Sequence, residues 1–196
     1  MDEERLIKRA QDGDSKAFEI LIETHFKKIY NIAYRIAGNP DDASDMTQEV
    51  MIKLFRNINS FGGNSKFSTW VYRVATNTCL DELKKLRRHS TYSINSEINT
   101  GDGEFLYEAE DTSPTPDLEV ERSELADMVA KAITALNPEH RAIITLRDIQ
   151  EFSYEEIANI LNISEGTVKS RISRARMQLK KILERDFNFG GTYFKE

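Results

Sequence analysis

The sequence predicts an all-α protein built from two small helical domains, and three observations support this fold class. Of the 196 residues, 31% are charged and 39% hydrophobic, and only nine are glycine and four proline, a composition typical of helical globular proteins. Apolar residues recur at helical spacing before residue 89 and again after residue 121. The segment between them lacks this periodicity, so we expect two separate helical domains.

Charge divides the chain in the same places. Residues 1–88 hold 15 Lys and Arg against 13 Asp and Glu, and residues 122–196 hold 12 against 11. Residues 89–121 hold no Lys or Arg and nine Asp and Glu, and they include Gly-Asp-Gly and Pro-Thr-Pro. This composition favours a flexible connector. The predicted organisation is a first domain over 1–88, an acidic linker over 89–121, a second domain over 122–186 and a tail over 187–196. The aromatic tail is expected to fray.

The first strong helix is predicted between Phe18 and Ile36, where apolar residues follow the helical period. The sequence Gly38-Asn39-Pro40 stops it. The stripe expected to face the core is Phe18, Leu21, Ile22, Phe26, Ile29, Ala33 and Ile36.

A second helix is expected to begin near Asp41, whose carboxylate can cap free backbone amides. Its buried side is predicted to consist of Met46, Val50, Leu54 and Ile58. Its other side is polar and carries Asp45, Gln48, Glu49, Lys53 and Arg56.

A third helix follows the loop 60–65 and ends in a basic cluster. Its predicted core residues are Phe67, Trp70, Val71, Val74 and Leu83. Cys79 lies in the same helix, and we expect it to pack rather than to react. The helix ends Lys84-Lys85-Leu86-Arg87-Arg88. One or two cations would complement the negative end of the helix dipole, but four exceed that need.

Residues 153–183, SYEEIANILNISEGTVKSRISRARMQLKKIL, predict a helix-turn-helix. Ser153 and Glu156 form a capping-box pattern at the start of a short helix. Asn162 and Ile163 make the turn, and Ser164 can cap the second helix.

The second helix of this motif has an apolar and a basic side. Val168, Ile172, Ala175 and Leu179 are predicted to face the core. From Glu165 to Arg185 there are seven Lys and Arg against two acids. Such a helix can enter the DNA major groove, where Arg pairs with guanine and hydroxyls contact bases or phosphates. The candidate DNA-binding residues are Glu165, Gly166, Lys169, Ser170, Arg171, Ser173 and Arg174.

Two further stretches carry a resemblance to a known family. FSTWVYRVATNTCLDELKKLRR and DDASDMTQEVMIKLF closely resemble region 2 of sigma factors, and the helix-turn-helix looks like region 4. The segment between them is too short for the middle domain of housekeeping sigma factors. The chain is therefore similar to the extracytoplasmic-function group (group 4) of the sigma-70 family, over about residues 5–88 and 120–185.

This resemblance implies an alternative sigma factor in the cytoplasm that directs promoter-specific initiation, as in a stress response. Its implied partners are core RNA polymerase, promoter DNA and an anti-sigma factor. The helix-turn-helix would read the minus-35 element. The implied docking residues for the largest polymerase subunits are Asp41, Asp45, Gln48, Glu49 and Lys53. The implied minus-10 residues are Asn64, Ser65, Lys66, Phe67, Arg73, Asn77, Lys84, Lys85, Arg87 and Arg88. For Trp70, on the apolar stripe, we expect a core position rather than base stacking.

Other function classes have weaker support in the sequence. A response-regulator-type transcription factor would need alternating strands and helices before its helix-turn-helix. A helical protein-binding adaptor would share the polar helix faces but would not bind DNA. An enzyme is not expected, because His25, His89 and His140 lie in separate contexts and no phosphate loop or metal-ligand pattern is present. We expect no cofactor, no metal and no membrane insertion, since no apolar run approaches the roughly 20 residues that cross a bilayer.

Overall fold

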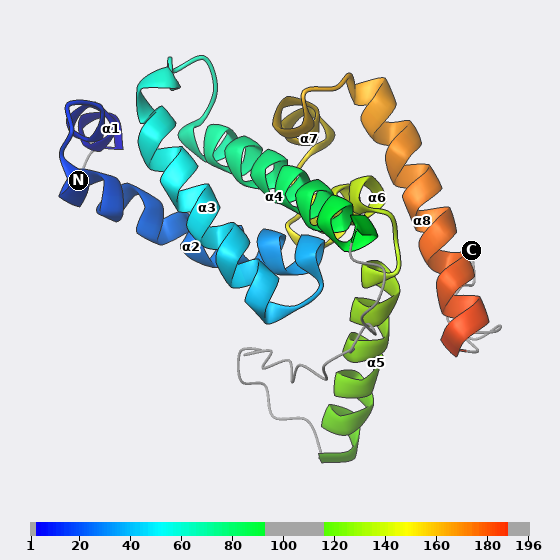
Figure 1. Cartoon of the computed structure of the whole chain (residues 1–196). Coiled ribbons are helices and arrows are strands. Elements are labelled where there is room, and N and C mark those ends of the chain that lie inside the picture. Colours follow the sequence, from blue (N-terminus) through cyan, green and yellow to red (C-terminus); the bar gives the residue numbers. More distant parts are fainter. Residues whose placement is uncertain (1–2, 93–115, 188–196) are drawn as a thin grey trace.

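The computed structural model describes residues 3–92 and 116–187, and every regular element within these ranges is helical. The predicted all-α class is therefore confirmed (Figure 1). The first domain comprises α1 (Glu3–Gln11), α2 (Ser15–Ala37), α3 (Pro40–Asn57), the 3-10 turn η1 (Ile58–Ser60) and α4 (Phe67–Tyr92). The second comprises α5 (Pro116–Thr134), α6 (Pro138–Ile144), the π-helical turn η2 (Thr145–Ile149), α7 (Tyr154–Leu161) and α8 (Glu165–Phe187).

The junction of α2 and α3 shows how local chemistry sets the helix ends. Gly38 has a φ of 90°, a left-handed conformation that glycine adopts freely, and it closes α2. Asn39 then caps α3, because its side chain accepts a 2.9 Å hydrogen bond from the Asp42 amide. The helix begins at Pro40, next to the expected Asp41, but Asp41 is not its capping residue as predicted. Asn39 takes the cap because Pro40 has no N–H to satisfy and fits the first helical position.

The core of the first domain lies between α2, α3 and α4. Its fully buried residues include Ile22, Ile29, Ile32, Ile36, Met46, Val50, Leu54, Val71 and Cys79. Burial raises the pKa of the Cys79 thiol to about 12, as expected for a packing residue. The predicted stripe was wrong at Phe26, which is 48% exposed. At 3.6 residues per turn Phe26 lies roughly 60° around α2 from Ile29, at the edge of the buried face.

The two domains pack against each other. Helix α7 contacts α4, and α5 and α6 contact α2, so the buried apolar residues form one continuous cluster. The Tyr72 and Phe152 rings meet across the boundary with centroids 5.1 Å apart. Gly38 allows the end of α2 to approach α5 closely, since a Cβ at this position would lie 2.6 Å from the Thr134 Cγ2.

The helices extend into the segment predicted as a linker. Helix α4 runs to Tyr92 and α5 starts at Pro116, inside the predicted range 89–121. The rest of that segment, 93–115, and the tail 188–196 lie outside the described residues. The flexibility of the linker and the fraying of the tail therefore stay predictions.

Candidate nucleic-acid interface

Helices α7 and α8 form the predicted helix-turn-helix. The Glu156 amide donates to Ser153 Oγ at 3.1 Å, and the Ser153 amide donates to Glu156 Oε2 at 2.9 Å. This reciprocal pair is the predicted capping box. Asn162 ends α7 with a φ of 53°, and the Thr167 amide donates to Ser164 Oγ at the start of α8. Each of these local predictions is confirmed.

Helix α8 buries one side and exposes the other. Val168, Ile172 and Ala175 are buried and Leu179 is half-buried, as expected. Among the candidate DNA-binding residues, Ser170 and Arg171 are half-buried. The fully exposed candidates are Glu165, Gly166, Lys169, Ser173 and Arg174.

The cationic side chains of α8 differ in the contacts that they make within the protein. Arg171 forms an ion pair with Glu139 at 3.4 Å, and Arg176 pairs with Asp148 through two guanidinium nitrogens. Lys169 lies 5.9 Å from the centre of the Tyr154 ring. Arg174 has no hydrogen bond or ion pair to any residue within 3–92 or 116–187. Arg174 is therefore the arginine of this helix that can turn to a base without breaking a contact.

The partners of Arg171 and Arg176 orient α8, and sequence reasoning missed them. Glu139 and Asp148 come from α6 and η2, and His140 Nδ1 of α6 lies 2.6 Å from Gln178 Oε1 of α8. These contacts join residues 28 to 38 positions apart within the second domain, and no local pattern signals such a pair. They fix α8 on its scaffold while its outer side stays open.

The second candidate surface is the loop before α4 and the outer side of that helix. Asn64, Ser65, Lys66, Arg73 and Asn77 are all exposed. On α4, Arg73 and Asn77 are one helical turn apart and so lie on one side. The structure therefore exposes this part of the predicted minus-10 set and brings Arg73 and Asn77 together on one side of α4.

Phe67 does not share that surface. It is only 2% exposed and packs its ring against Phe61 and Trp70, with centroids 5.3 and 5.7 Å away. Trp70, also 2% exposed, is a core residue as expected. These three rings, of which Phe61 is half-buried, anchor the loop, and Gln11 Nε2 donates a 3.0 Å hydrogen bond to the Phe61 carbonyl. Phe67 is thus a core residue that supports the loop, and its buried ring is not accessible for stacking on a base.

The basic end of α4 is exposed but partly neutralised. Lys85 donates to Glu82 at 2.7 Å, and this hydrogen bond raises the Lys85 pKa. Lys84 lies 3.8 Å from Asp81. Arg87 and Arg88 are exposed as well. The four predicted cations therefore carry less free charge than their number suggests.

The polar side of α3 is presented as predicted, with a gradient of exposure. Asp41, Asp45 and Gln48 are exposed, while Glu49 and Lys53 are half-buried. Lys53 Nζ is 3.9 Å from carboxylate oxygens of both Glu49 and Glu82. The first three residues are thus open to a partner, while Lys53 pairs with Glu49 along α3 and also links this helix to Glu82 of α4.

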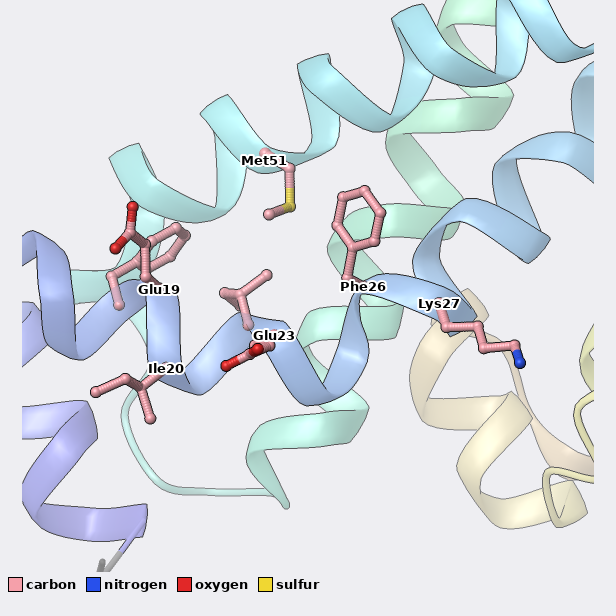
Figure 2. Close-up of a pocket in the computed structure, with 8 residues that line it drawn as sticks. Glu19, Ile20, Glu23, Phe26, Lys27 and Met51 are labelled. Atoms are coloured by element: carbon pink, nitrogen blue, oxygen red, sulfur yellow. The ribbon is translucent and has the colours of Figure 1, made fainter.

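Beside this polar side lies an apolar groove between α2 and α3 that sequence reasoning did not predict. Figure 2 shows Met51 of α3 and Phe26 of α2 pointing into the space between the two helices. Ile20, Ile52 and Phe55 add exposed apolar surface, each between 43% and 45% exposed. Gln48 lines an adjoining hollow together with Phe26 and Met51. The groove therefore continues into the predicted polymerase-docking side of α3.

Membrane-spanning helices and metal-binding clusters are both absent from residues 3–92 and 116–187. No helix in these ranges is long and apolar enough to cross a membrane. No group of three or more His, Cys, Asp or Glu side chains in the same ranges could hold a metal ion.

Comparison with known proteins assigns both domains. The family described as Sigma-70 region 2 matches residues 21–89, and the family described as Sigma-70, region 4 matches residues 126–179. The ECF RNA polymerase sigma factor SigW of Bacillus subtilis is 38% identical over 90% of this chain and 94% of its own. The RNA polymerase sigma-H factor of Pseudomonas aeruginosa is 34% identical over 93% of this chain and 94% of its own.

A solved structure supports the same assignment. The sigma factor RpoE of Bartonella quintana, in complex with the anti-sigma factor NepR, aligns with a TM-score of 0.66 and 25% identity. The alignment covers 87% of this chain and 99% of that one. With both regions matched in order, the chain belongs to the ECF sigma factors of the sigma-70 family.

Proposed function

We propose that this protein binds core RNA polymerase in the cytoplasm and directs it to promoters through minus-10 and minus-35 elements, with no chemistry of its own. The observation that carries this proposal is the presence of two separate exposed recognition surfaces, on α4 and α8, in a chain that matches sigma regions 2 and 4. An anti-sigma factor is a further proposed partner, because the similar RpoE structure contains one.

The minus-35 element is assigned to α8. Its exposed side carries Lys169, Ser173 and Arg174, and Arg174 has no competing partner in the described ranges. A free guanidinium can donate two hydrogen bonds to guanine O6 and N7 in the major groove. Arg171 and Arg176 keep their ion pairs and hold the helix in position.

The minus-10 element is assigned to the loop 62–66 and the exposed side of α4. Drawing a base out of the stack costs a few kcal/mol, which polar contacts and nearby cations can offset. Asn64, Ser65 and Asn77 supply the polar groups, and Lys66 and Arg73 supply the charge. The basic end of α4 would contact the phosphates of the adjoining duplex.

Polymerase docking is assigned to α3. Asp41, Asp45 and Gln48 project from one side of this helix without burial, as a polar docking surface requires. We place the functional domains over 1–88 and 122–186, with 89–121 as connector and 187–196 as tail.

The alternative functions lack a supporting observation. A response-regulator-type factor needs a domain of strands and helices, and residues 3–92 contain helices alone. A protein-binding adaptor would not need the exposed basic side of α8. The comparisons likewise return sigma factors.

Transcription in vitro tests the proposal. Purified core polymerase would be supplied with this protein and a fragmented genomic library, and the start sites mapped. The expected result is initiation at a shared pair of minus-10 and minus-35 sequences that core alone ignores. Starts identical with and without the protein would refute it, and an Arg174→Ala variant should change which minus-35 sequences are used.

A further inference from the structure

Tyr154, the first residue of α7, holds two cationic side chains against its ring. The guanidinium carbon of Arg147, in η2, lies 4.8 Å from the ring centre, and the ammonium of Lys169, in α8, lies 5.9 Å from it. An aromatic face attracts a cation because the ring quadrupole is negative there. Tyr154 therefore connects the segment before the helix-turn-helix to the helix that is proposed to enter DNA.

The three residues of this cluster are held to different degrees. Arg147 is half-buried and donates a 2.8 Å hydrogen bond to the Phe152 carbonyl. Tyr154 is half-buried as well and packs against the hydrophobic core. Lys169 is exposed, and a long exposed side chain otherwise samples many rotamers. The firmly held ring thus restricts the conformations of the lysine.

The cluster carries positive charge that the protein does not neutralise. Neither Arg147 nor Lys169 forms an ion pair with a carboxylate in the described part of the chain. The carboxylate of Asp148, next to Arg147 in sequence, is bound by Arg176. Two cations at one ring repel each other, and a bound anion would relieve this repulsion. A DNA phosphate is the anion that the proposed function brings to this surface.

The direction in which Lys169 is held decides which part of the DNA it reaches. In a helix-turn-helix the second helix enters the major groove, while the first crosses the sugar-phosphate backbone. Helix α7 lies beside α8 (Figure 1), and the Tyr154 ring draws Lys169 toward α7 and hence toward the backbone. Arg174 is five residues further along, ~140° around the helix, and has no such contact within the described residues. Lys169 is thus directed at phosphate, and Arg174 stays available for a base.

We propose that Tyr154 is a positioning residue for minus-35 binding: its ring, fixed by Arg147, holds the Lys169 ammonium against a backbone phosphate beside the minus-35 bases. Lys169 then sets the register of α8 on the duplex and does not read a base, since phosphate contacts position a protein and base contacts specify sequence. This proposal rests on the proposed function, which supplies the duplex.

The test measures binding of the holoenzyme, this protein with core polymerase, to a promoter duplex identified by the transcription experiment. Phosphates around the minus-35 element are replaced one at a time by methylphosphonates, each of which removes one negative charge. The variants are Lys169→Ala, Tyr154→Leu and the two combined. Tyr154→Phe is the matched control, since it keeps the ring and loses only the hydroxyl.

One methylphosphonate should weaken binding of the wild-type holoenzyme and leave that of Lys169→Ala unchanged. Lys169→Ala should bind all minus-35 sequences more weakly by the same factor, and a roughly fourfold rise in salt should lower its affinity about 3.5-fold less than that of wild type. Tyr154→Leu should lower affinity about two- to fivefold, with no further loss when Lys169 is already alanine. Tyr154→Phe should retain the phosphate contact, because phenylalanine also attracts a cation.

Equal losses from Tyr154→Leu with and without Lys169 would show that the ring is only structural and would overturn the proposal. A changed base preference in Lys169→Ala would do the same, because Lys169 would then be a base reader. Circular dichroism checks the helices of Tyr154→Leu, and Tyr154→Met, which also lacks a ring, replaces it if they are lost. A wild-type holoenzyme that initiates at no promoter removes the proposed function itself, so the two failures are distinguishable.

Discussion

Helices α4 and α8 are both proposed to bind DNA, yet they are held in the fold in different ways. Helix α8 buries one side, and ion pairs from α6 and η2 fix it. Helix α4 is buried around most of its circumference, and over residues 67–80 its only exposed side chains are Arg73 and Asn77. Reading an intact duplex needs a rigid helix with one free side. Capturing separated bases needs polar and cationic groups on a firmly packed helix, and α4 presents Asn77 and Arg73 on such a helix.

The loop before α4 gives the largest expected effect. Deleting Gly62, Gly63 and Asn64 should abolish opening of the duplex, because the pocket for an unpaired base is lost. Minus-35 binding should survive, since it belongs to the other domain. With an unpairing cost of a few kcal/mol, activity on duplex promoters should fall by about 100-fold or more.

Permanganate reactivity of unpaired thymines measures this opening directly. A promoter already unpaired at minus-10 should recover part of the activity. Normal opening by the deletion variant would show that the loop does not capture a base. Loss of polymerase assembly would show instead that the loop is structural.

Substitutions on helix α8 are expected to have the next largest effect. Arg174→Ala should relax discrimination at one minus-35 base pair by about 1–3 kcal/mol, roughly 5- to 150-fold. Lys181→Ala, which alters an exposed cation further along α8, should weaken binding to all sequences and lower its salt dependence. Binding to a panel of minus-35 variants at several salt concentrations separates the two. Unchanged base preference in Arg174→Ala would mean that α8 meets DNA with another side.

Reversing a charge on the docking side of α3 should have a smaller effect on function. Asp45→Lys is expected to reduce affinity for core polymerase by roughly tenfold, a loss of about 1.4 kcal/mol. Glu49→Lys should also reduce affinity, but it disrupts the local pair with Lys53 as well, so Asp45 is the cleaner test. Pull-down of core, with helicity measured in parallel, gives the result. Unchanged binding by a folded Asp45→Lys protein would show that this side of α3 is not the docking surface. The apolar groove beside Phe26 would then be the next surface to alter.

The smallest effect concerns the capping box that starts α7. Ser153→Ala should lower the free energy of unfolding by about 1 kcal/mol. Glu156, the other half of the box, has a folded-state pKa below its ordinary value of 4.5 because the Ser153 amide donates to its carboxylate. Its contribution is therefore present above the unfolded pKa and is lost as the pH falls through the folded pKa. Thermal unfolding of Glu156→Ala should differ from wild type at pH 7 and converge with it in acid below that range. A constant difference across this range would show that the carboxylate charge is not involved.

Local patterns predicted much of the fold and part of the candidate site. The capping box at Ser153, the turn at Asn162 and the buried side of α8 all depend on residues within a few positions of one another, and each is confirmed. The cap of α3 was misplaced because Asp41 and Asn39 are both good capping residues and only the geometry of Pro40 decides between them.

Long-range contacts could not be predicted in the same way. The helical period placed Phe26 in the core, but how far the buried side of α2 extends depends on where α3 lies. The ion pair of Arg171 with Glu139 and the contact of Tyr72 with Phe152 depend on packing between distant segments. The resemblance to sigma factors supplied roles for residues such as Phe67, and burial of its ring then made it a support rather than a contact.

Arg141 couples the unfolding of the two domains, because it forms hydrogen bonds in both. Burial lowers its pKa to about 10, so it stays charged near neutral pH, and its guanidinium donates to the Ile36 carbonyl at the end of α2. It also donates to the Thr134 and Leu136 carbonyls of its own domain. One cation thus serves the carbonyl ends of two helices from different domains. In calorimetry the free protein should then unfold in a single cooperative transition. Phe152→Lys, which removes the contact with the Tyr72 ring and places a cation near Lys28, should split this transition into two.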